Sequence, residues 1–464
     1  MHDTAAEAAR VQGIRMTVPH RVHLVGIGGA GMSAIARILA QRGHSVSGSD
    51  LHEGRAVAAL RALGVEVHVG HDAAHVADSD VVVISTAVPE DNPEVRSARE
   101  RGIPVVPRAR MLADTLAGDR SVLVAGTHGK TTTTSMVVVA LHAAGIDPTF
   151  AIGGELNEAG TNAHAGKDPV AVAEADESDR SFLAYEPDVA IVTNLELDHP
   201  EVYRDLEDVL DAFVAFLERR RPGGVAVVCI DDPGVRRLLK RTAGSVVTYG
   251  TSAEADVRLV ERSGQPHVLV DGTAHPLVLG VPGQHNLLNA AAAIAACRSL
   301  GAPLAGVLEG LARFRGAARR FQRLGEVDGV SVVDDYAHHP TELRATLAAA
   351  RSTGVERIVC VVQPHRYSRT AVLGEELGRA AAGADLVIVT EVYGAGERPV
   401  PGVNGLLVAE AARAAGARVS YEPHLASVAP LLAAEVRSGD LVLVTGAGDV
   451  SQVGPSLLAL LSGR

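Results

Sequence analysis

The residues best suited to chemistry lie in the segment GTHGKTTTT, at positions 126–134. An apolar run at 121–125 precedes it, and the run at 135–145 that follows has the composition of a helix. A strand, a glycine turn and a helix start in this order present backbone N–H groups and the positive end of a helix dipole to an anion. The segment therefore predicts a phosphate-binding loop made of Gly126, Thr127, His128, Gly129, Lys130, Thr131 and Thr132.

Lys130 and Thr131 suit a nucleoside triphosphate, because the ammonium group reaches terminal phosphates and the hydroxyl ligates Mg²⁺. The motif reads G-x-x-G-K-T, since Val124 stands where the general nucleotide loop has its first glycine. The alternative is a glycine-rich turn with a chance lysine. Only three of the 43 Lys and Arg residues are lysines, however. A lysine at this point therefore favours a phosphate contact, and we expect ATP or GTP.

A second glycine-rich turn, GIGGAGMS at 26–33, follows an apolar run and matches G-x-G-x-x-G at Gly26, Gly28 and Gly31. Asp50 ends the next expected strand. Such glycines allow close approach of a diphosphate, and such a carboxylate binds ribose hydroxyls. Taken alone, the turn fits an NAD-dependent oxidoreductase, but beside a separate triphosphate loop a UDP-sugar fits at least as well. A plain strand-end cap remains the alternative for Asp50.

The composition argues against several classes of protein. The 464 residues are 47% hydrophobic and carry a net charge of −12 without long charged blocks, which disfavours nucleic acid or a membrane surface as partner. The three cysteines are far apart and have apolar neighbours, so we expect reduced thiols. No apolar run approaches the length of a membrane span and residues 1–20 lack a signal-peptide pattern. We therefore expect a cytoplasmic protein, either a monomer or a homodimer.

Short β-branched runs alternate with Ala- and Leu-rich stretches, which is the pattern of parallel sheets covered by helices. The length predicts two to four domains, and three segments open with their own strand and turn. The segment 244–280 has short alternating runs with turn residues and predicts antiparallel hairpins. The expected strands are 22–27, 81–86, 121–126, 188–194, 224–230, 357–363, 385–392 and 440–446.

Polar residues stand just past several of these runs. Glu174 and His199 each follow an apolar run, and in a parallel sheet both would lie at the carboxyl edge beside the phosphate loop. Oxygen ligands at such a place suit Mg²⁺. A surface acid and a capping or core histidine are the alternatives. His285, Asn286 and Asn289 open an Ala-rich helical stretch, where a cap explains one amide and the cluster as a whole suits an adenine edge.

Two later segments combine polar residues with strand ends. DDYAHHPTE at 334–342 packs two carboxylates, a tyrosine and two histidines into six residues, more than its ordinary helix-start signals need. Arg366 and Arg369 in QPHRYSRT suit carboxylates, because guanidinium groups bind them in a bidentate manner. A solvated arginine pair is the alternative there. Arg319 and Arg320 stand near a domain boundary, where either a phosphate contact made on domain closure or an exposed basic pair fits.

Together these segments resemble those of the Mur ligases, ATP-dependent enzymes that form amide bonds in bacterial cell-wall synthesis. The resemblance implies three domains: a Rossmann-like UDP-sugar domain at 1–117, a central P-loop ATPase-type domain at 118–316, and a Rossmann-like amino-acid domain at 317–464. It covers the chain in family order, and it rests on GIGGAGMS (26–33), GTHGKTTT (126–133), EADESD (174–179), TNLELDH (193–199), PGQHNLLNA (282–290), RRF (319–321), DDYAHHPTE (334–342), QPHRYSRT (363–370), EVYGAGE (391–397) and GAGD (446–449).

The resemblance further implies that ATP, Mg²⁺, UDP-N-acetylmuramate and L-alanine are used, through an acyl phosphate formed from the lactyl carboxylate. One Mg²⁺ would be held by Thr131 and Glu174, and a second by Glu174 and His199. The implied catalytic residues are Lys130, Glu174, His199, Arg320 and His338. The implied nucleotide contacts outside the loop are His285, Asn286, Asn289, Arg320 and Asp335. The implied substrate contacts are Gly28, Gly29, Ala30, Gly31, Met32, Ser33, Asp50, Tyr336, His338, Arg366 and Arg369.

Some features depart from the family pattern. No lysine occurs between 167 and 240, so the carbamoylated lysine that supports the second metal in several Mur ligases is absent, as expected of the alanine-adding branch. Glu391 stands where the family more often has Asp. Two alternatives remain open: a ligase that returns a murein tripeptide to the same UDP-sugar, and a non-enzymatic nucleotide or UDP-sugar sensor. The intact metal and phosphate residues disfavour the sensor.

Overall fold

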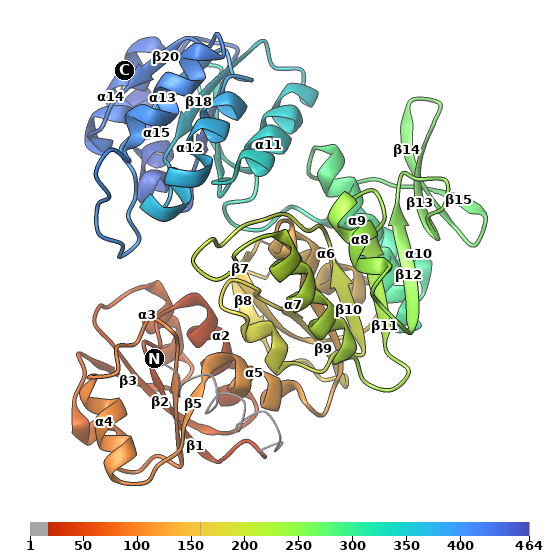
Figure 1. Ribbon diagram of the computed structural model, residues 1–464, viewed down its shortest axis with the longest axis vertical. Coiled ribbons are helices and arrows are strands. Elements are labelled where there is room, and N and C mark those ends of the chain that lie inside the picture. The colour runs from red at the N-terminus through yellow and green to blue at the C-terminus, as the bar shows by residue number, and fades with distance from the viewer. Residues whose placement is uncertain (1–16, 158, 464) are drawn as a thin grey trace. The chain divides into compact units, whose positions relative to one another are not determined.

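The computed structural model describes residues 17–157 and 159–463, which form three β-sheets accompanied by helices (Figure 1). The chain divides into two compact units. The first comprises the residues up to Leu195 together with Val209–Pro276 and Ala291–Leu311, and it contains two of the sheets. The second comprises Glu196–Asp208, Leu277–Ala290 and Ala312–Arg464, and it contains the third.

The N-terminal sheet has five strands in the order β3-β2-β1-β4-β5, and all of its pairs are parallel. Strand β4 (Val81–Ile84) shows why this sheet forms. A parallel strand in such a sheet needs apolar residues on both faces, and Val81, Val82 and Val83 are fully buried. Its strands are β1 (Arg21–Val25), β2 (Ser45–Asp50), β3 (Glu66–Val69), β4 (Val81–Ile84) and β5 (Val105–Pro107), and its helices are α2 (Ala30–Gln41), α3 (Arg55–Ala62), η1 (Ala73–Val76), α4 (Pro93–Glu100) and α5 (Arg108–Leu116).

The central sheet has ten strands in the order β15-β14-β13-β12-β11-β10-β6-β9-β7-β8. Strand β6, which leads into the predicted phosphate loop, lies between β10 and β9 and is parallel to both. The strands are β6 (Arg120–Ala125), β7 (Thr149–Leu156), β8 (Thr161–His164), β9 (Val170–Glu174), β10 (Val189–Val192), β11 (Val225–Cys229), β12 (Ser245–Gly250), β13 (Val257–Arg262), β14 (Gln265–Val270) and β15 (Thr273–Pro276).

The segment between the central and the C-terminal sheets adds two long helices to those within the central region. The expected helix after the phosphate loop begins at Lys130, five residues before the apolar run that suggested it. The helices of this part of the chain are α6 (Lys130–Ala143), η2 (Ser181–Ala184), α7 (Leu206–Glu218), α8 (Pro233–Leu239), α9 (Gln284–Ser299) and α10 (Leu304–Arg313).

The hairpin prediction for residues 244–280 is right for three strands and wrong for the first. Strands β13, β14 and β15 pair in an antiparallel manner, as expected. Strand β12 instead pairs in parallel with both β11 and β13 and so extends the parallel sheet. The reason is that alternation of apolar and polar residues indicates one exposed face of a strand and says nothing of its direction.

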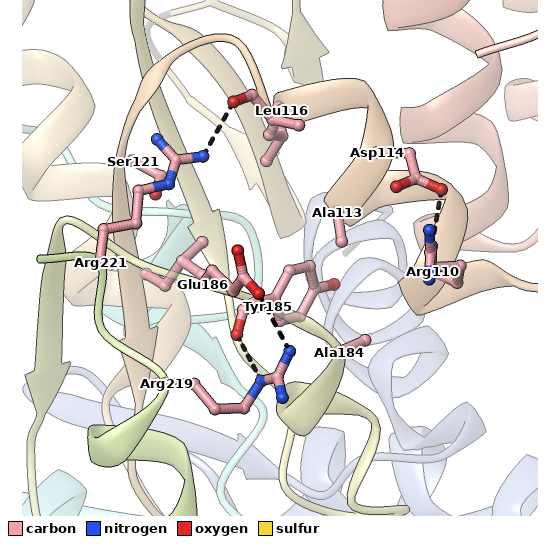
Figure 2. A pocket seen from close by; sticks show the side chains of 12 residues that line it. Arg110, Ala113, Asp114, Leu116, Ser121, Ala184, Tyr185, Glu186, Arg219 and Arg221 are labelled. Atoms are coloured by element: carbon pink, nitrogen blue, oxygen red, sulfur yellow. Dashed lines mark hydrogen bonds and ion pairs between the residues drawn. The ribbon is translucent and has the colours of Figure 1, made fainter. Parts of the chain in front are cut away.

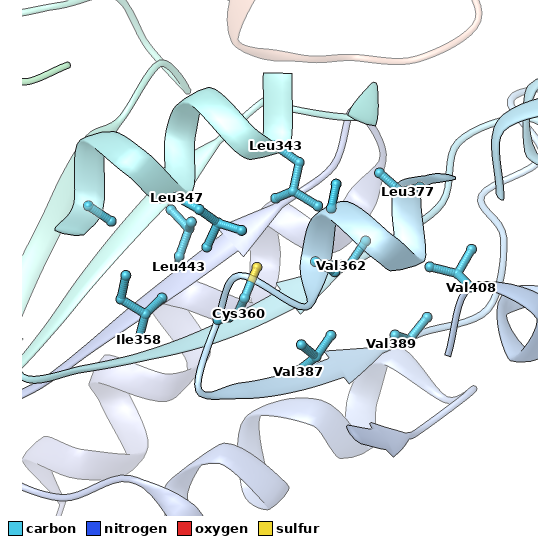
Figure 3. Packing of buried hydrophobic residues seen from close by; sticks show 14 of the residues in the cluster. Leu343, Leu347, Ile358, Cys360, Val362, Leu377, Val387, Val389, Val408 and Leu443 are labelled. Carbon is cyan, nitrogen blue, oxygen red and sulfur yellow. The ribbon is translucent and has the colours of Figure 1, made fainter. Parts of the chain in front are cut away.

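The C-terminal sheet has six strands in the order β16-β17-β21-β18-β19-β20, and β16 alone of these is antiparallel to its neighbour. One face packs on α11, α12 and α13 through a cluster of buried residues that includes Leu343, Cys360 and Leu377 (Figure 3). The elements are β16 (Gln322–Val327), β17 (Val330–Asp335), β18 (Arg357–Val362), β19 (Leu386–Val389), β20 (Val419–Tyr421), β21 (Asp440–Thr445), α11 (Pro340–Ser352), α12 (Tyr367–Ala381), α13 (Gly405–Ala414), α14 (Leu425–Glu435), η3 (Asp449–Gln452) and α15 (Val453–Ser462).

The predicted α/β class with parallel sheets is confirmed. The cysteines Cys229, Cys297 and Cys360 are buried and free, as their apolar neighbours indicated. In the described part of the chain, no helix combines the length and apolar composition that crossing a membrane requires.

Candidate active site

The predicted phosphate loop joins β6 to α6, and two of its glycines have backbone conformations that other residues rarely adopt. Gly126 has a φ of 126°, and a Cβ there would lie 2.1 Å from the Thr193 hydroxyl oxygen. Gly129 has a φ of 82° and directly precedes the first residue of α6, Lys130. These conformations turn the chain from the strand edge into the helix, so the loop ends at the N–H groups of the first helical turn.

Thr193 and Asn194, which follow β10, hold the loop in this shape. The Thr193 hydroxyl donates to the His128 carbonyl at 2.6 Å, and the Asn194 amide nitrogen donates to the same carbonyl at 3.1 Å. The His128 N–H donates to the Asn194 side-chain oxygen at 2.8 Å, and the Thr127 N–H donates to the Asn194 carbonyl at 3.0 Å. The sequence assigned no role to either residue, because a motif does not show which loop it packs against.

The Lys130 ammonium is held inside the loop by three oxygen atoms. It donates to the Gly126 carbonyl at 2.8 Å, to the Thr127 carbonyl at 3.3 Å, and to the Glu177 carboxylate at 2.7 Å. Burial by itself lowers the pKa of Lys130, but the carboxylates of Glu177, Asp176 and Glu174 offset this effect and hold the pKa above its ordinary value. Lys130 is therefore cationic at neutral pH and faces an acidic run that begins at Glu174.

Glu174 and Thr131 lie at the same edge of the central sheet as the loop. Glu174 ends β9 and is opposite Val124 of β6, and its carboxylate accepts the Gly153 N–H at 2.6 Å. Thr131 and Thr132 are buried in the first turn of α6. Carboxylate and hydroxyl oxygens are the donors that Mg²⁺ prefers, so the chemistry of Thr131 and Glu174 fits this ion. Their role as ligands remains a prediction.

The glycine turn of the N-terminal sheet is closed by Asp50. Its carboxylate accepts the Gly28 N–H at 2.9 Å and the His52 N–H at 3.2 Å. A Cβ on Gly28 would lie 2.8 Å from that carboxylate, so a larger residue there would have to displace the Asp50 side chain. The strand-end interpretation of Asp50 therefore has direct support, while its predicted ribose contact remains untested. In the following turn Met32 and Ser33 are buried, and Gly29 directly precedes α2.

In the second unit, Arg319 and Arg320 have different surroundings. Arg319 donates to the Asp334 carboxylate at 3.1 Å and to the Gly446 carbonyl at 2.6 Å, so it joins two strand ends of the C-terminal sheet. The Arg320 guanidinium lies over the Tyr336 ring, with its carbon 4.8 Å from the ring centre. The Arg319 guanidinium carbon also lies 5.1 Å from the centre of the Tyr336 ring, and the phosphate contact of Arg320 remains a prediction.

Asp335 is buried and holds together the segments on either side of β17. Its carboxylate accepts the Phe321 N–H at 2.7 Å, the Ala337 N–H at 2.8 Å and the Thr346 hydroxyl at 3.2 Å. Burial raises its pKa against the opposing effect of these donors and of Arg320. The structure thus gives Asp335 a structural role that the sequence did not predict, and its ribose contact remains a prediction.

His338 follows this strand end, and its protonated ring nitrogen can be assigned. Nδ1 lies 3.0 Å from the Tyr336 carbonyl, which can only accept, so Nδ1 carries the proton and Nε2 has the free electron pair in the neutral ring. Burial lowers the pKa of His338 to about 4. The ring packs at right angles against Tyr336 and lies 5.6 Å from the ring of His365. A neutral acceptor is therefore present among the predicted substrate contacts.

The two arginines of the QPHRYSRT segment are also different from each other. Arg369 is buried and binds Asp198 through two nitrogens, at 3.0 and 3.1 Å. Arg366 is partly exposed and pairs with Glu201 at 3.0 Å. Both acids flank His199, which has a left-handed φ of 55°. A substrate carboxylate would therefore find Arg366 more accessible than Arg369, and both contacts remain predictions.

The three polar residues at the start of α9 are arranged by the preceding turn. The Asn286 amide donates to the Pro282 carbonyl at 2.6 Å, and the Asn289 amide donates to the Asn286 side chain at 3.4 Å. Gly283 has a φ of 103°, and a Cβ there would lie 2.7 Å from the His285 ring. Burial lowers the pKa of His285 to about 4, so its ring is neutral and can accept a hydrogen bond from an adenine amino group.

The predicted residues fall into two sets. The two glycine turns, Asp50 and Glu174 belong to the first unit, and the residues from His199, the α9 start and the C-terminal region belong to the second. A cavity beside α5 in the first unit contains none of them (Figure 2). Its arginines are paired with acids, as in the contacts of Arg110 with Asp114 and of Arg219 with Glu186. This cavity is not part of the candidate site.

Comparison with known protein families identifies the class of protein to which this fold and its glycine loop belong. Three family models match successive parts of the chain: "Mur ligase family, catalytic domain" over 21–120, "Mur ligase middle domain" over 124–297, and "Mur ligase, glutamate ligase domain" over 319–448. The chain belongs to the Mur ligase family.

Relatives within the family carry more specific names. UDP-N-acetylmuramate–L-alanine ligase of Acidothermus cellulolyticus is 53% identical over 96% of this chain and 95% of its own. The crystal structure of UDP-N-acetylmuramate–alanine ligase from Thermotoga maritima is 33% identical, covers 96% of this chain and 99% of its own, and has a TM-score of 0.80. A UDP-N-acetylmuramate:L-alanyl-γ-D-glutamyl-meso-diaminopimelate ligase from Neisseria meningitides is 30% identical, covers 65% of this chain and 100% of its own, and has a TM-score of 0.60.

Proposed function

We propose that this protein uses ATP to join L-alanine to the lactyl carboxylate of UDP-N-acetylmuramate, a step in the synthesis of peptidoglycan precursors. The observation that carries the proposal is the 53% identity, over nearly the whole of both chains, to a relative of that name. The buried Lys130 in a glycine loop beside Glu174 supports the use of a triphosphate.

The proposed reaction has two steps. The lactyl carboxylate attacks the γ-phosphorus of ATP, which forms an acyl phosphate and releases ADP. The amino group of L-alanine then attacks the acyl carbon, loses a proton, and expels inorganic phosphate to leave the amide. Lys130 and the N–H groups of the loop stabilise charge on the transferred phosphoryl group, and the protein acts mainly by positioning.

Several residues would bind and orient the reactants. Thr131 and Glu174 would hold one Mg²⁺ and Glu174 and His199 a second, and the ions would neutralise charge on the phosphates. Arg366 would bind a carboxylate, since its side chain is 37% exposed. His338 would offer the Nε2 electron pair to the amino group of L-alanine, because its Nδ1 proton is committed to the Tyr336 carbonyl.

The test is phosphate release by the purified protein with ATP, Mg²⁺, UDP-N-acetylmuramate and L-alanine, with each component omitted in turn. We expect release to require all four and the product to be heavier by one alanine residue. Release only when the L-Ala-γ-D-Glu-meso-diaminopimelate tripeptide replaces L-alanine would favour the activity named for the Neisseria relative. Absence of release with every amino acid and peptide would refute the ligase proposal and favour a sensor.

Two lysine variants separate the roles of the first two sheets. Lys130→Ala should abolish turnover while calorimetry still detects binding of the UDP-sugar. Lys240→Ala removes the same charge from an exposed position after α8 and should leave turnover unchanged. Loss of UDP-sugar binding in Lys130→Ala would contradict the assignment of sugar-nucleotide binding to the N-terminal sheet.

A further inference from the structure

The side chain of Arg108 lies directly over the glycine turn of the N-terminal sheet. Arg108 is the first residue of α5, and Gly31 lies in the first turn of α2. A Cβ on Gly31 would lie 2.1 Å from Arg108 Nη1 and 3.1 Å from the guanidinium carbon. A side chain at the third glycine of the G-x-G-x-x-G motif would therefore displace the Arg108 guanidinium from its place over the turn.

Several arginines near the same sheet have an acidic partner in an ion pair, which the Arg108 guanidinium lacks in the described part of the chain. Arg42 pairs with Asp119, Arg61 pairs with Glu53, and Arg110, two residues further along α5, pairs with Asp114. For Arg108, no hydrogen bond or ion pair is found within 17–157 and 159–463, although its side chain is half-buried. A half-buried cation over a turn that suits a diphosphate is an arrangement that an anionic ligand would complete.

The position of Arg108 also places its charge near the acidic run of the central sheet. Asp176 lies close enough to Arg108 for the two side chains to interact electrostatically. The ammonium of Lys130 acts on the same aspartate, so the two predicted phosphate sites have one acidic residue in common.

We propose that Arg108 binds the diphosphate group of the nucleotide-linked substrate at the glycine turn. The inference rests on the proposed function, since it assigns a residue to its sugar-nucleotide site. A guanidinium group donates two parallel N–H bonds to phosphate oxygens, and the N–H groups at the start of α2 supply further donors. Arg108 acts by binding alone, and no bond is made or broken at this residue. The diphosphate, rather than the uridine, is the part of the substrate that it recognises.

The test compares ligands with and without phosphates on the full chain. Affinities are measured by calorimetry for UDP and by ligand-observed NMR for uridine, with the wild type and the Arg108→Ala, Arg108→Lys and Arg96→Ala variants. We expect Arg108→Ala to weaken UDP binding at least tenfold and uridine binding less than twofold. Arg108→Lys should weaken UDP binding less than Arg108→Ala does, since lysine keeps the positive charge but lacks the two parallel N–H donors of the guanidinium group. Arg96→Ala removes an exposed charge from α4 and should change neither affinity.

A second variant keeps the inference testable if Arg108→Ala folds poorly. Gly31→Ala leaves the arginine in the chain but pushes its guanidinium away from the turn, and should also weaken UDP binding. In a chain that already carries Arg108→Ala, it should have a much smaller effect. Unchanged UDP affinity in both single variants, or equal losses for UDP and uridine, would overturn the assignment. A wild type that binds neither UDP nor UDP-N-acetylmuramate would overturn the proposed function as well.

Discussion

Lys130 and Glu177 form a buried ion pair, with 2.7 Å between Nζ and Oε1, that links the phosphate loop to the acidic run following β9. Both side chains are mostly buried. Burial raises the pKa of Glu177, and the neighbouring lysine opposes that effect. The lysine that the sequence assigns to phosphate binding is thus already neutralised by the protein, and a bound nucleotide must compete with Glu177 for it.

The first prediction separates the structural role of this pair from catalysis. Lys130→Met should lower the free energy of unfolding by about 3 kcal/mol, because removal of one partner leaves a buried charge uncompensated. Lys130→Met combined with Glu177→Gln should recover most of that stability while turnover stays absent. Urea denaturation and phosphate release measure the two properties. Equal stability of the single and double variants would show that the pair is not coupled in the way the contact suggests.

The second prediction concerns the two acids that flank His199. Asp198→Asn should destabilise the protein by about 3 kcal/mol, since it breaks a buried bidentate pair with Arg369. Glu201→Gln is the matched control, because its pair with Arg366 is about one-third exposed; it should cost less than about 1 kcal/mol. The shift of the urea denaturation midpoint gives both changes in free energy, provided that the dependence of the unfolding free energy on urea concentration is the same in all variants. The prediction fails if the two variants are destabilised to the same extent.

The third prediction is a pH dependence that arises from Glu94, a fully buried residue of α4. Burial by itself raises its pKa, but the nearby His23 ring and hydrogen bonds from Ser49 and His75 lower it to about 2. Because this pKa lies below that of the unfolded chain, the contribution to stability is present above about pH 4.5 and is lost as the pH falls toward 2. Its size is on the order of 3 kcal/mol.

The Glu94→Gln variant tests this dependence. Between pH 5 and pH 3, its free energy of unfolding should vary less steeply with pH than that of the wild type. At the steepest point the difference in slope should correspond to close to one proton taken up on unfolding. The exposed Glu100 at the end of the same helix offers a control, Glu100→Gln, which should keep the wild-type slope. Identical slopes in Glu94→Gln and wild type would show that the carboxylate keeps its ordinary pKa on folding.

Local patterns in the sequence predict individual strands and helices of this protein but not the order of strands in its sheets, and this difference has a physical reason. The strand before Lys130 and the helix after it were predictable, because a β-branched run, a glycine turn and a helical run are adjacent in the chain. The order of strands within each sheet was not, since pairing such as that of β6 with β9 and β10 joins distant segments.

The same limit applies to the candidate site. Lys130 and Glu174 stand in motifs and were singled out from them. Glu177, Asn194 and Asp198 occur in quoted motifs too, but their partners lie far away in the sequence, and spacing does not show such contacts. Arg108 lies outside every motif that the sequence offers. Only the fold brings it over Gly31.

The last prediction follows from the surroundings of His338. Burial lowers its pKa to about 4, so the folded protein takes up this proton at a lower pH than the unfolded chain, where an ordinary histidine titrates near 6.5. Folding is therefore penalised as the pH falls from 6.5 to 4, by an amount that approaches about 3 kcal/mol. Nitrogen-15 NMR of the imidazole should show a neutral ring with the proton on Nδ1 at pH 6, and titration near pH 4. His338→Gln should remove that part of the acid sensitivity of stability. A ring that is half-protonated at pH 6.5, or protonated on Nε2, would contradict both the pKa and the hydrogen bond to the Tyr336 carbonyl.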